Sequence, residues 1–438
     1  MKDILKNIVK KILRGLAKAI LKKYQPDIIG VTGSFGKTSA KEAIFTVLSH
    51  KFNVRRNIKN YNNEIGLPLT IIGAGSGGRS TWLWLGVFIK ALVMLAWKER
   101  SYPEVLILEM AVDRPGDMPY LIDLAPCKIG VVTNIGPAHL EYFKTLERIA
   151  REKSLLVSHI DKNGWAILNG DNQYVCEMQE TIRAKVLTYG FKNEADIRAS
   201  EIKILPGETN SGGEEIEDGG TLGLNFKLTH RGSTVPVFLP NILGEHLIYA
   251  ALAGTAVGIS YAMNLVEISQ SLRFFAAPRG RMNLIPGLKN TMIIDDTYNA
   301  GPDSTLAAIK ALGKINSQNK KFAVLGDMLE LGSFTDEAHE IIGRAVRENK
   351  IDILITVGER AKIIAAEAEK RGMAPDQIFS FSDALTAGRF VQDRIEPGDI
   401  ILVKGSQGMR MEKIVKEIMA EPLKAKDLLV RQDKIWLN

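Results

Sequence analysis

A glycine-rich turn followed by a lysine and a threonine lies near the start of the chain, in the stretch IIGVTGSFGKTSAKE that begins at Ile28. The apolar run predicts a strand and the residues after the turn predict a helix, so the backbone N–H groups between them could bind phosphate oxygens. Lys37 would neutralise phosphate charge, and the hydroxyl of Thr38 would ligate Mg²⁺. The stretch departs from the G-x-x-x-x-G-K-[ST] pattern, because Val31 holds the first glycine position and Gly33 supplies the turn instead.

Three further residues follow apolar runs or lie on a predicted helix, where they could complete a metal site. Glu109 ends the run VLILE, His139 lies just beyond the run IGVVTNI, and Lys153 lies in REKSLL. Each also has a purely structural interpretation. Glu109 could form an ion pair, His139 could cap a helix, and Lys153 could be a solvated surface lysine.

Strands and helices alternate along most of the chain, as in α/β proteins. Apolar runs predict buried parallel strands at DIIGVTG, VLILEMA, KIGVVTNI, GWAILNG, KVLTYG, TMIIDDTYN, KFAVLGDM, DILITVG and DIILVKGS. Helices are predicted at 39–49, 146–159, 245–257 and 265–275. We therefore expect an α/β fold with a central P-loop, doubly wound, mostly parallel sheet, and a C-terminal Rossmann-like α/β domain. Short alternating runs at 196–240 predict a small β insertion in the central sheet.

This pattern divides the chain into three parts: a basic helix at 1–26, a central domain with the phosphate loop at 27–276 and a C-terminal domain at 277–438. The stretch AAPRGRMN at 276–283 marks the second boundary. Ligands of such sheets bind beyond the carboxyl ends of the strands. We therefore expect the site at those ends, in a cleft between the two larger domains.

The net charge of +7 resides entirely in residues 1–23, which hold eight Lys or Arg residues against Asp3. The rest of the chain is neutral overall, so its charge gives no reason to expect nucleic acid binding. Apolar residues recur at helical spacing between these lysines. Two interpretations stay open: a helix on an anionic membrane surface, or a helix packed on its own domain.

A second apolar stretch runs from Trp82 to Trp97 with Lys90 inside it. Sixteen residues are fewer than the roughly 20 that a membrane-spanning helix needs. A buried or partner-facing helix and an interfacial helix anchored by tryptophans are both consistent with this stretch. Cys127 and Cys176 have no metal-binding spacing, and residues 1–23 do not resemble a signal peptide.

Seven motifs of the chain, taken together and in order, resemble those of the Mur ligases, most closely the MurF branch. They lie between residues 28 and 415 and read VTGSFGKTSAKE, YNNEIGLPLT, LEMAVDRPGDM, VVTNIGPAHLEYFKTLERIAREK, DDTYNAGPDS, LGDMLELG and LVKGS. The resemblance implies ATP-dependent amide formation. A substrate carboxylate is phosphorylated by ATP, and an amine then displaces phosphate from the acyl phosphate. Such chemistry needs positioning and charge neutralisation more than a protein nucleophile.

The resemblance also implies roles for individual residues. Thr38 and Glu109 would hold one Mg²⁺, and His139 and a carbamylated Lys153 a second. ATP would be bound by Gly33, Ser34, Gly36, Lys37, Thr38 and Ser39, and from the C-terminal domain by Arg281, Asp296, Tyr298 and Asn299. Asn60, Asn62, Asn63, Lys404, Gly405 and Ser406 would face the substrates. Lys37, His139, Lys153 and Lys404 would be the catalytic residues.

The chain departs from the family pattern in three places. A basic helix stands where the family has an N-terminal UDP-binding domain, so we expect that domain to be absent. Leu247 and Ala250 replace two asparagines after His246, so the adenine contact must come from elsewhere. Ala111 and Val112 replace the usual Gly-Ala pair.

The leading hypothesis is a ligase of peptidoglycan precursor synthesis that joins a muramoyl-peptide carboxylate to a D-Ala-D-Ala-like amine. We expect a cytoplasmic monomer that binds no nucleic acid. Contact of 1–23 and 81–98 with the inner face of the membrane stays open as the alternative to packing of these segments on the protein. Two alternatives are a related amide ligase, such as a folylpolyglutamate, cyanophycin or poly-γ-glutamate synthase, and a nucleotide-binding pseudo-ligase.

Overall fold

The computed structural model describes residues 2–58, 61–78, 80–136, 140–206, 222–432 and 436. The chain forms two compact units. Unit 1 comprises residues 1–203, 225–239 and 246–276, and unit 2 comprises 204–224, 240–245 and 277–438. In the described part of the chain no helix is long and apolar enough to cross a membrane.

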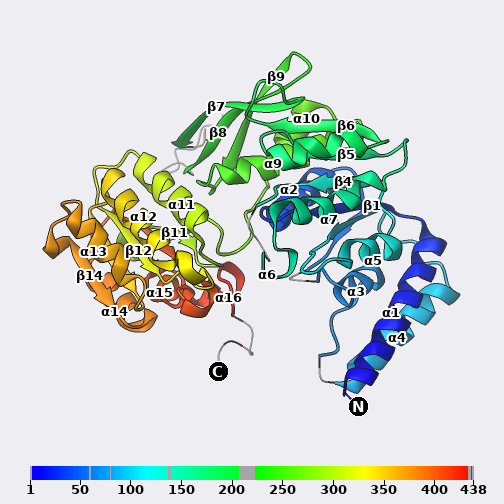
Figure 1. The fold of residues 1–438 in the computed structure, drawn as a ribbon, viewed down its shortest axis with the longest axis horizontal. Helices are drawn as coiled ribbons and strands as arrows, with labels where there is room; N and C mark the ends of the chain where they lie inside the picture. Colours follow the sequence, from blue (N-terminus) through cyan, green and yellow to red (C-terminus); the bar gives the residue numbers. More distant parts are fainter. Residues whose placement is uncertain are drawn as a thin grey trace, which may run out of the picture. The chain divides into compact units, whose positions relative to one another are not determined.

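The first sheet has nine strands in the order β2-β3-β1-β4-β5-β6-β7-β8-β9 (Figure 1). Their bounds are β1 Asp27–Thr32, β2 Val54–Arg56, β3 Val105–Glu109, β4 Ile129–Val132, β5 Trp165–Asn169, β6 Lys185–Gly190, β7 Ile197–Pro206, β8 Leu222–His230 and β9 Ser233–Pro240. The pairs from β2 to β7 are parallel. The strand order changes direction at β1, which is where α/β sheets bind ligands.

Two helical layers cover this sheet, which confirms the doubly wound α/β prediction. The helices are α1 Lys2–Tyr24, α2 Lys37–Leu48, α3 Gly66–Ile72, α4 Thr81–Ala96, α5 Asp117–Leu124, α6 Leu140–Phe143, α7 Leu146–Ser158, α8 Gln173–Cys176, α9 His246–Ser260 and α10 Leu265–Leu272. One layer contains α2, α9 and α10, and the other contains α1, α3, α4, α5 and α7. Gly254 lets α9 approach α2 closely, because a Cβ there would lie 3.1 Å from the Ala43 backbone.

Strands β7, β8 and β9 form the predicted β insertion at one edge of the sheet. Arg231 and Gly232 join β8 to β9 with φ of 48° and 81°, the left-handed conformation of a two-residue hairpin loop. The predicted helices at 39–49, 146–159, 245–257 and 265–275 correspond to α2, α7, α9 and α10.

The N-terminal helix α1 packs on unit 1, against α3, α4 and α5. Leu13, Ala17 and Ile20 are fully buried, as the helical spacing of apolar residues requires. Of the two interpretations of this helix, the structure therefore supports packing on its own domain along that face. The opposite face of α1 remains exposed at Lys11 and Lys22.

Unit 2 contains a six-stranded sheet in the order β10-β11-β15-β12-β13-β14. The strands are β10 Asn283–Pro286, β11 Met292–Asp296, β12 Lys321–Gly326, β13 Ile353–Val357, β14 Ile378–Phe381 and β15 Ile400–Lys404. The helices are α11 Pro302–Lys314, α12 Thr335–Glu348, α13 Lys362–Lys370, α14 Ala384–Arg394, α15 Glu412–Ile418 and α16 Ala425–Leu428. Only the edge pair β10–β11 is antiparallel among the described pairs. The C-terminal Rossmann-like α/β prediction is confirmed.

Candidate active site

The turn between β1 and α2 has the backbone of a phosphate loop. Gly33 has φ 146° and Gly36, the N-cap residue of α2, has φ 79°, and both values favour glycine. A Cβ on Gly33 would lie 2.1 Å from the Thr133 hydroxyl, so this position has no room for a side chain. The N–H groups of the first turn of α2 therefore open onto the loop, as anion binding requires.

The ammonium of Lys37 curls back over this turn. Its Nζ donates to the carbonyl oxygens of Gly33 at 2.7 Å and Ser34 at 3.2 Å. Thr38 is half-buried in the same turn of the helix, whereas Ser39 is buried. The loop thus presents one cation and one hydroxyl beside the N-terminus of α2.

Residues after β4 hold the phosphate loop in place. The Ser34 N–H donates to the Asn134 carbonyl at 2.6 Å, and the Ser34 hydroxyl exchanges hydrogen bonds with the backbone of Gly136. The Thr133 hydroxyl donates to the Phe35 carbonyl at 2.5 Å. Sequence reasoning considered only His139 in this segment and missed Thr133 and Asn134. His139 itself lies outside the described residues.

The carboxylate of Glu109 is buried beside the phosphate loop. Glu109 is the register partner of Val31, two residues before Gly33, and is 4% exposed. Its Oε1 accepts from Asn62 at 3.2 Å, but Oε2 has no hydrogen-bond donor among the described residues. Lys41 Nζ is 3.8 Å from Oε2, an ion-pair distance. Lys41 compensates part of the charge of this buried carboxylate, and a metal ion would supply the direct partner that Oε2 lacks among the described residues.

The asparagines near Glu109 have different environments. Asn62 contacts Glu109, whereas the side chain of Asn63 accepts from the N–H groups of Ile65 and Gly66 at the start of α3. Asn60 lies outside the described residues. Asn57, which sequence reasoning missed, is buried and accepts from the Glu109 N–H at 2.9 Å, so it fixes the end of β3.

Lys153 on α7 is 3% exposed, so it is not a solvated surface lysine. Burial, together with a smaller effect of the nearby charge of Lys37, lowers the pKa of its ammonium to about 7. The charges of Asp113, Glu152 and Asp117 raise this pKa, but they do not return it to the ordinary value of a lysine. The interaction with Lys37 places Lys153 near the phosphate loop. With this pKa, a large share of the Lys153 side chains would be neutral amines near pH 7.

The second unit brings three of its predicted residues together at one sheet edge. Lys404 and Asp296 are register partners in β15 and β11, and Lys404 Nζ lies 2.6 Å from Asp296 Oδ2. The same ammonium donates to the Asn299 carbonyl at 2.9 Å. The Ser406 hydroxyl donates to the Ala300 carbonyl and accepts from the Leu329 N–H, which follows the LGDM motif. The ends of β11, β15 and β12 are thereby joined.

Arg281 and Tyr298 lie against each other in unit 2. The guanidinium of Arg281 is 4.3 Å from the centre of the Tyr298 ring, a cation–π distance. Its buried Nε lacks an acceptor among the described residues. Next to them, burial raises the pKa of Asp295 to about 6, although Thr297 donates two hydrogen bonds to its Oδ1.

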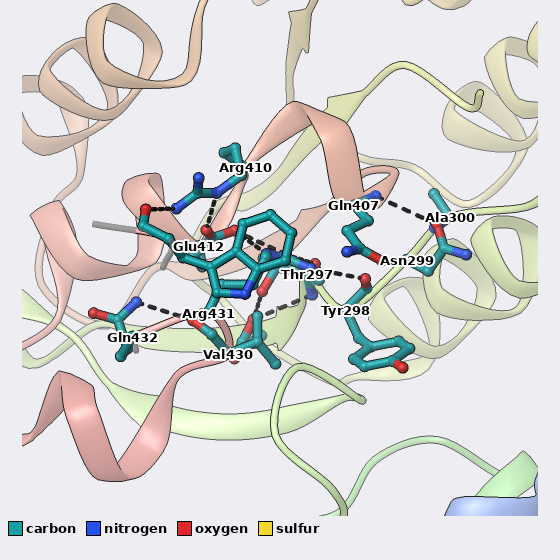
Figure 2. Close-up of polar contacts among 12 residues, drawn as sticks. Thr297, Tyr298, Asn299, Ala300, Gln407, Arg410, Glu412, Val430, Arg431 and Gln432 are labelled. Atoms are coloured by element: carbon teal, nitrogen blue, oxygen red, sulfur yellow. Dashed lines mark hydrogen bonds and ion pairs between the residues drawn. The ribbon is translucent and has the colours of Figure 1, made fainter. Parts of the chain in front are cut away.

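A buried arginine supports the loop that carries Tyr298 and Asn299 (Figure 2). Arg431 donates to the carbonyl oxygens of Thr297 and Tyr298 and to Glu412 Oε2. Glu412 is 1% exposed, and its other oxygen accepts from Arg410 at 2.7 Å. Sequence reasoning found neither Glu412 nor Arg431, because no motif contains them.

Two residues of α9 depart from the family pattern. Leu247 and Ala250, which stand where asparagines were expected, are buried on α9.

No group of three or more His, Cys, Asp or Glu side chains that could hold a metal occurs among the described residues. The metal ligands predicted from the sequence also include a threonine, a lysine and His139.

The chain is similar to proteins of one family. The models of the Mur ligase middle domain and of the Mur ligase, glutamate ligase domain match residues 89–258 and 280–407. The UDP-N-acetylmuramoyl-tripeptide–D-alanyl-D-alanine ligase of Bacillus subtilis (strain 168) is 31% identical over 411 residues, covering 94% of this chain and 80% of that protein. MurF from Acinetobacter baumannii has a TM-score of 0.74 at 26% identity, covering 92% and 79% of the two chains. MurF from Thermotoga maritima in complex with ADP has a TM-score of 0.72 at 26% identity, covering 95% and 84%.

Proposed function

Because the chain belongs to the Mur ligase family as a MurF-like member, we propose that it adds D-alanyl-D-alanine to the peptide of a UDP-muramoyl-tripeptide. It is an ATP-dependent, ADP-forming peptide ligase of peptidoglycan precursor synthesis. The comparisons favour this function over the two alternatives, another amide ligase and a pseudo-ligase.

The observation that carries the proposal is the arrangement at the end of β1. The phosphate loop with Lys37, the buried Glu109 opposite Val31 in register, and the buried Lys153 all belong to this part of unit 1. A phosphoryl-transfer site needs a cation and backbone donors for the phosphates, together with carboxylate ligands for a metal. This region contains all of these groups.

The reaction proceeds in two steps that need no protein nucleophile. A carboxylate oxygen of the tripeptide attacks the γ-phosphorus of ATP, the bond to the ADP oxygen breaks, and an acyl phosphate forms. The amine nitrogen of D-Ala-D-Ala then attacks the acyl carbon, loses a proton and expels phosphate. The loop N–H groups and Lys37 hold the phosphates and neutralise the charge that develops on them.

We propose that two Mg²⁺ ions take part, one held by Thr38 and Glu109 and one by His139 and a carbamylated Lys153. Mg²⁺ would supply charge neutralisation between phosphate oxygens. Glu109 Oε2, which has no hydrogen-bond donor in the part of the chain that the structure describes, supports the first site. Carbamylation of Lys153 adds CO₂ to the neutral amine, releases a proton and turns the side chain into an anionic ligand. Its burial favours the neutral amine that this reaction needs.

Unit 2 would contribute its own contacts. Arg281, Asp296, Tyr298 and Asn299 would contact the nucleotide, and Lys404, Gly405 and Ser406 would contact the substrates, together with the asparagines at 60, 62 and 63. The protein would work as a monomer in the cytoplasm, where ATP is available, without nucleic acid. Membrane contact would involve a different surface, formed by α1 and α4.

The test measures ADP release from ATP and Mg²⁺ in the presence of UDP-muramoyl-tripeptide, with and without D-Ala-D-Ala. We expect release to require both substrates. Lys37→Ala should lower the rate at least 100-fold, because it removes a charge that contacts the transferring phosphate. The control Lys51→Ala removes an exposed lysine paired with Glu267 at the other end of α2 and should leave the rate unchanged. ATP binding without ADP release from this substrate would contradict the proposed substrate.

A further inference from the structure

Helix α4 is apolar on two opposite faces, although only one of them is covered by the protein. Val87 and Ala91 are buried against unit 1. An α-helix turns by about 100° per residue, so Trp82, Ile89 and Val93 lie on the side opposite Ala91. They are 80%, 51% and 48% exposed. A surface helix of a water-soluble domain normally carries polar residues on that side, so this face requires an explanation.

The exposed face extends over the whole length of the helix. Its large apolar members are Trp82, Leu83, Leu85, Ile89, Leu92, Val93 and Trp97. The single charged residue between 81 and 97 is Lys90, and its Nζ donates to the Gly73 carbonyl at 2.6 Å. This ammonium is thereby held against a neighbouring loop.

Helix α1 runs beside α4 and widens this surface (Figure 1). Lys23 Nζ donates to the carbonyls of Met94 and Leu95 at 3.1 and 2.8 Å, so the last turns of both helices lie together. This contact identifies the side of α1 that faces α4. Counted from Lys23 at about 100° per residue, Ile8 and Ile12 lie next to the side of α1 that faces α4, toward the solvent. They are 48% and 46% exposed.

Not all of the basic charge of α1 is available to a partner. Lys10 pairs with Glu64, and both Arg14 and Lys18 pair with Asp123. Among the side chains that the structure describes, exposed cations at the border of the apolar face include Lys11 and Lys22 on α1 and Lys98 and Arg100 after α4, and Glu99 lies among them. The rim is therefore net basic around an apolar centre.

We propose that this α1/α4 surface, made of the exposed apolar residues of α4, Ile8, Ile12 and the basic rim, binds the protein to an anionic lipid bilayer. Tryptophans near both ends of an apolar face and lysines at its edge match the layers of a membrane interface. Helix α4 has 16 residues, or about 24 Å, which is shorter than the roughly 30 Å hydrocarbon core. The helix therefore lies in the plane of the interface and does not cross it.

Charge also argues against a second copy of the chain as the occupant. A symmetric dimer would place the same surface on both sides and bring the two basic rims together. An anionic bilayer instead complements the rim and accepts the apolar centre. This surface contains none of the residues of the proposed active site, so membrane binding and ligase activity can be tested separately.

The test is flotation of the full chain with vesicles of phosphatidylcholine containing 30% phosphatidylglycerol. We expect binding that falls at least tenfold in the Ile89→Glu/Val93→Glu variant, because two carboxylates would enter the apolar layer. Lys11→Glu/Lys22→Glu should weaken binding to these vesicles more than to pure phosphatidylcholine, by about fivefold or more per charge. Leu423→Glu is the control, since Leu423 is 99% exposed on unit 2, and it should bind like the parent chain.

Two further readouts separate the possible occupants. Brominated lipids should quench the tryptophan fluorescence of the parent chain, and the Trp82→Phe/Trp97→Phe variant should lose most of that quenching. Absence of flotation by the parent chain, or unchanged flotation of Ile89→Glu/Val93→Glu, would overturn the proposal. A dimer in light scattering that this variant dissociates, without vesicle binding, would assign the surface to a second copy instead.

Discussion

The ammonium of Lys404 lies 2.6 Å from the carboxylate of Asp296, at the ends of two neighbouring parallel strands in which they are register partners. Both side chains are buried. The ammonium also donates to the Asn299 carbonyl at 2.9 Å, so it ties the end of β15 to the loop after β11. A residue expected to contact substrate thus has a structural function as well.

Breaking this pair should destabilise unit 2. Lys404→Met leaves the Asp296 carboxylate buried without its cation, and we expect a loss of about 3 kcal/mol in the free energy of unfolding. The double variant Lys404→Met/Asp296→Asn should recover part of this loss, because the remaining group is neutral. Urea denaturation of the three proteins measures both effects. A fully stable Lys404→Met protein that has lost only activity would show that the pair does not support the fold.

Gly33→Ala should abolish ATP binding. The substitution introduces a Cβ at φ 146° and 2.1 Å from the Thr133 hydroxyl, so the loop must move. The matched control is Gly86→Ala in α4, where a Cβ meets nothing within 4 Å. It should bind ATP normally and gain about 0.5–1 kcal/mol of helix stability. Equilibrium dialysis with ATP would detect the difference, and normal binding by Gly33→Ala would disprove the assigned loop function.

Lys153 should react with CO₂. Incubation with ¹³C-bicarbonate should give a carbamate carbonyl signal in the ¹³C spectrum that is absent from Lys153→Ala. That variant should lose ligase activity, and formate or acetate should restore part of it by supplying a free carboxylate in the space left by the side chain. The exposed Lys162→Ala variant serves as the control and should keep the signal. A parent spectrum without that signal, at saturating bicarbonate, would exclude the modification.

The pH dependence of stability should reveal Asp295. Its pKa is raised to about 6, chiefly by burial, so between its ordinary value near 4 and pH 6 the folded protein binds more protons than the unfolded chain. The free energy of unfolding therefore falls as the pH rises through this window and stays lower above it. Asp295→Asn removes this loss, so its stability relative to the parent should increase by up to about 3 kcal/mol between pH 4 and 7.

The control for this titration is Asp383→Asn. Asp383 is the N-cap of α14, and hydrogen bonds from the N–H and hydroxyl of Thr386 lower the pKa of its carboxyl. Its contribution to stability is present above its unfolded pKa and is lost as the pH falls. Asp383→Asn should therefore lose stability at neutral pH, the opposite of Asp295→Asn. Urea unfolding at several pH values measures both, and equal curves for Asp295→Asn and the parent would contradict the assignment.

The sequence predicted the main strands because each buried strand is a continuous apolar run that ends in glycine or a polar residue. The short strands β2, β10 and β14 were missed, since three or four residues carry too little pattern. Local motifs identified the phosphate loop and Glu109, but not what surrounds them. Asn57 and Thr133 act through contacts with residues about 50 and 100 positions away, which no local pattern records. The helical spacing of α1 was equally clear, yet only the structure shows which face is covered.

Arg431 is another residue that no local sequence pattern identifies. It lies 133 residues after Tyr298, whose carbonyl it binds, and Glu412 neutralises its charge. If Arg431 positions the loop that carries Tyr298 and Asn299, Arg431→Leu should raise the KM for ATP several-fold and change kcat less, and Arg431→Lys should recover part of the affinity. Steady-state ADP release measures both constants. Arg389→Leu is the exposed control and should match the parent. A purely structural function would lower stability and the amount of active enzyme while leaving the KM for ATP unchanged, so the two constants decide between the interpretations.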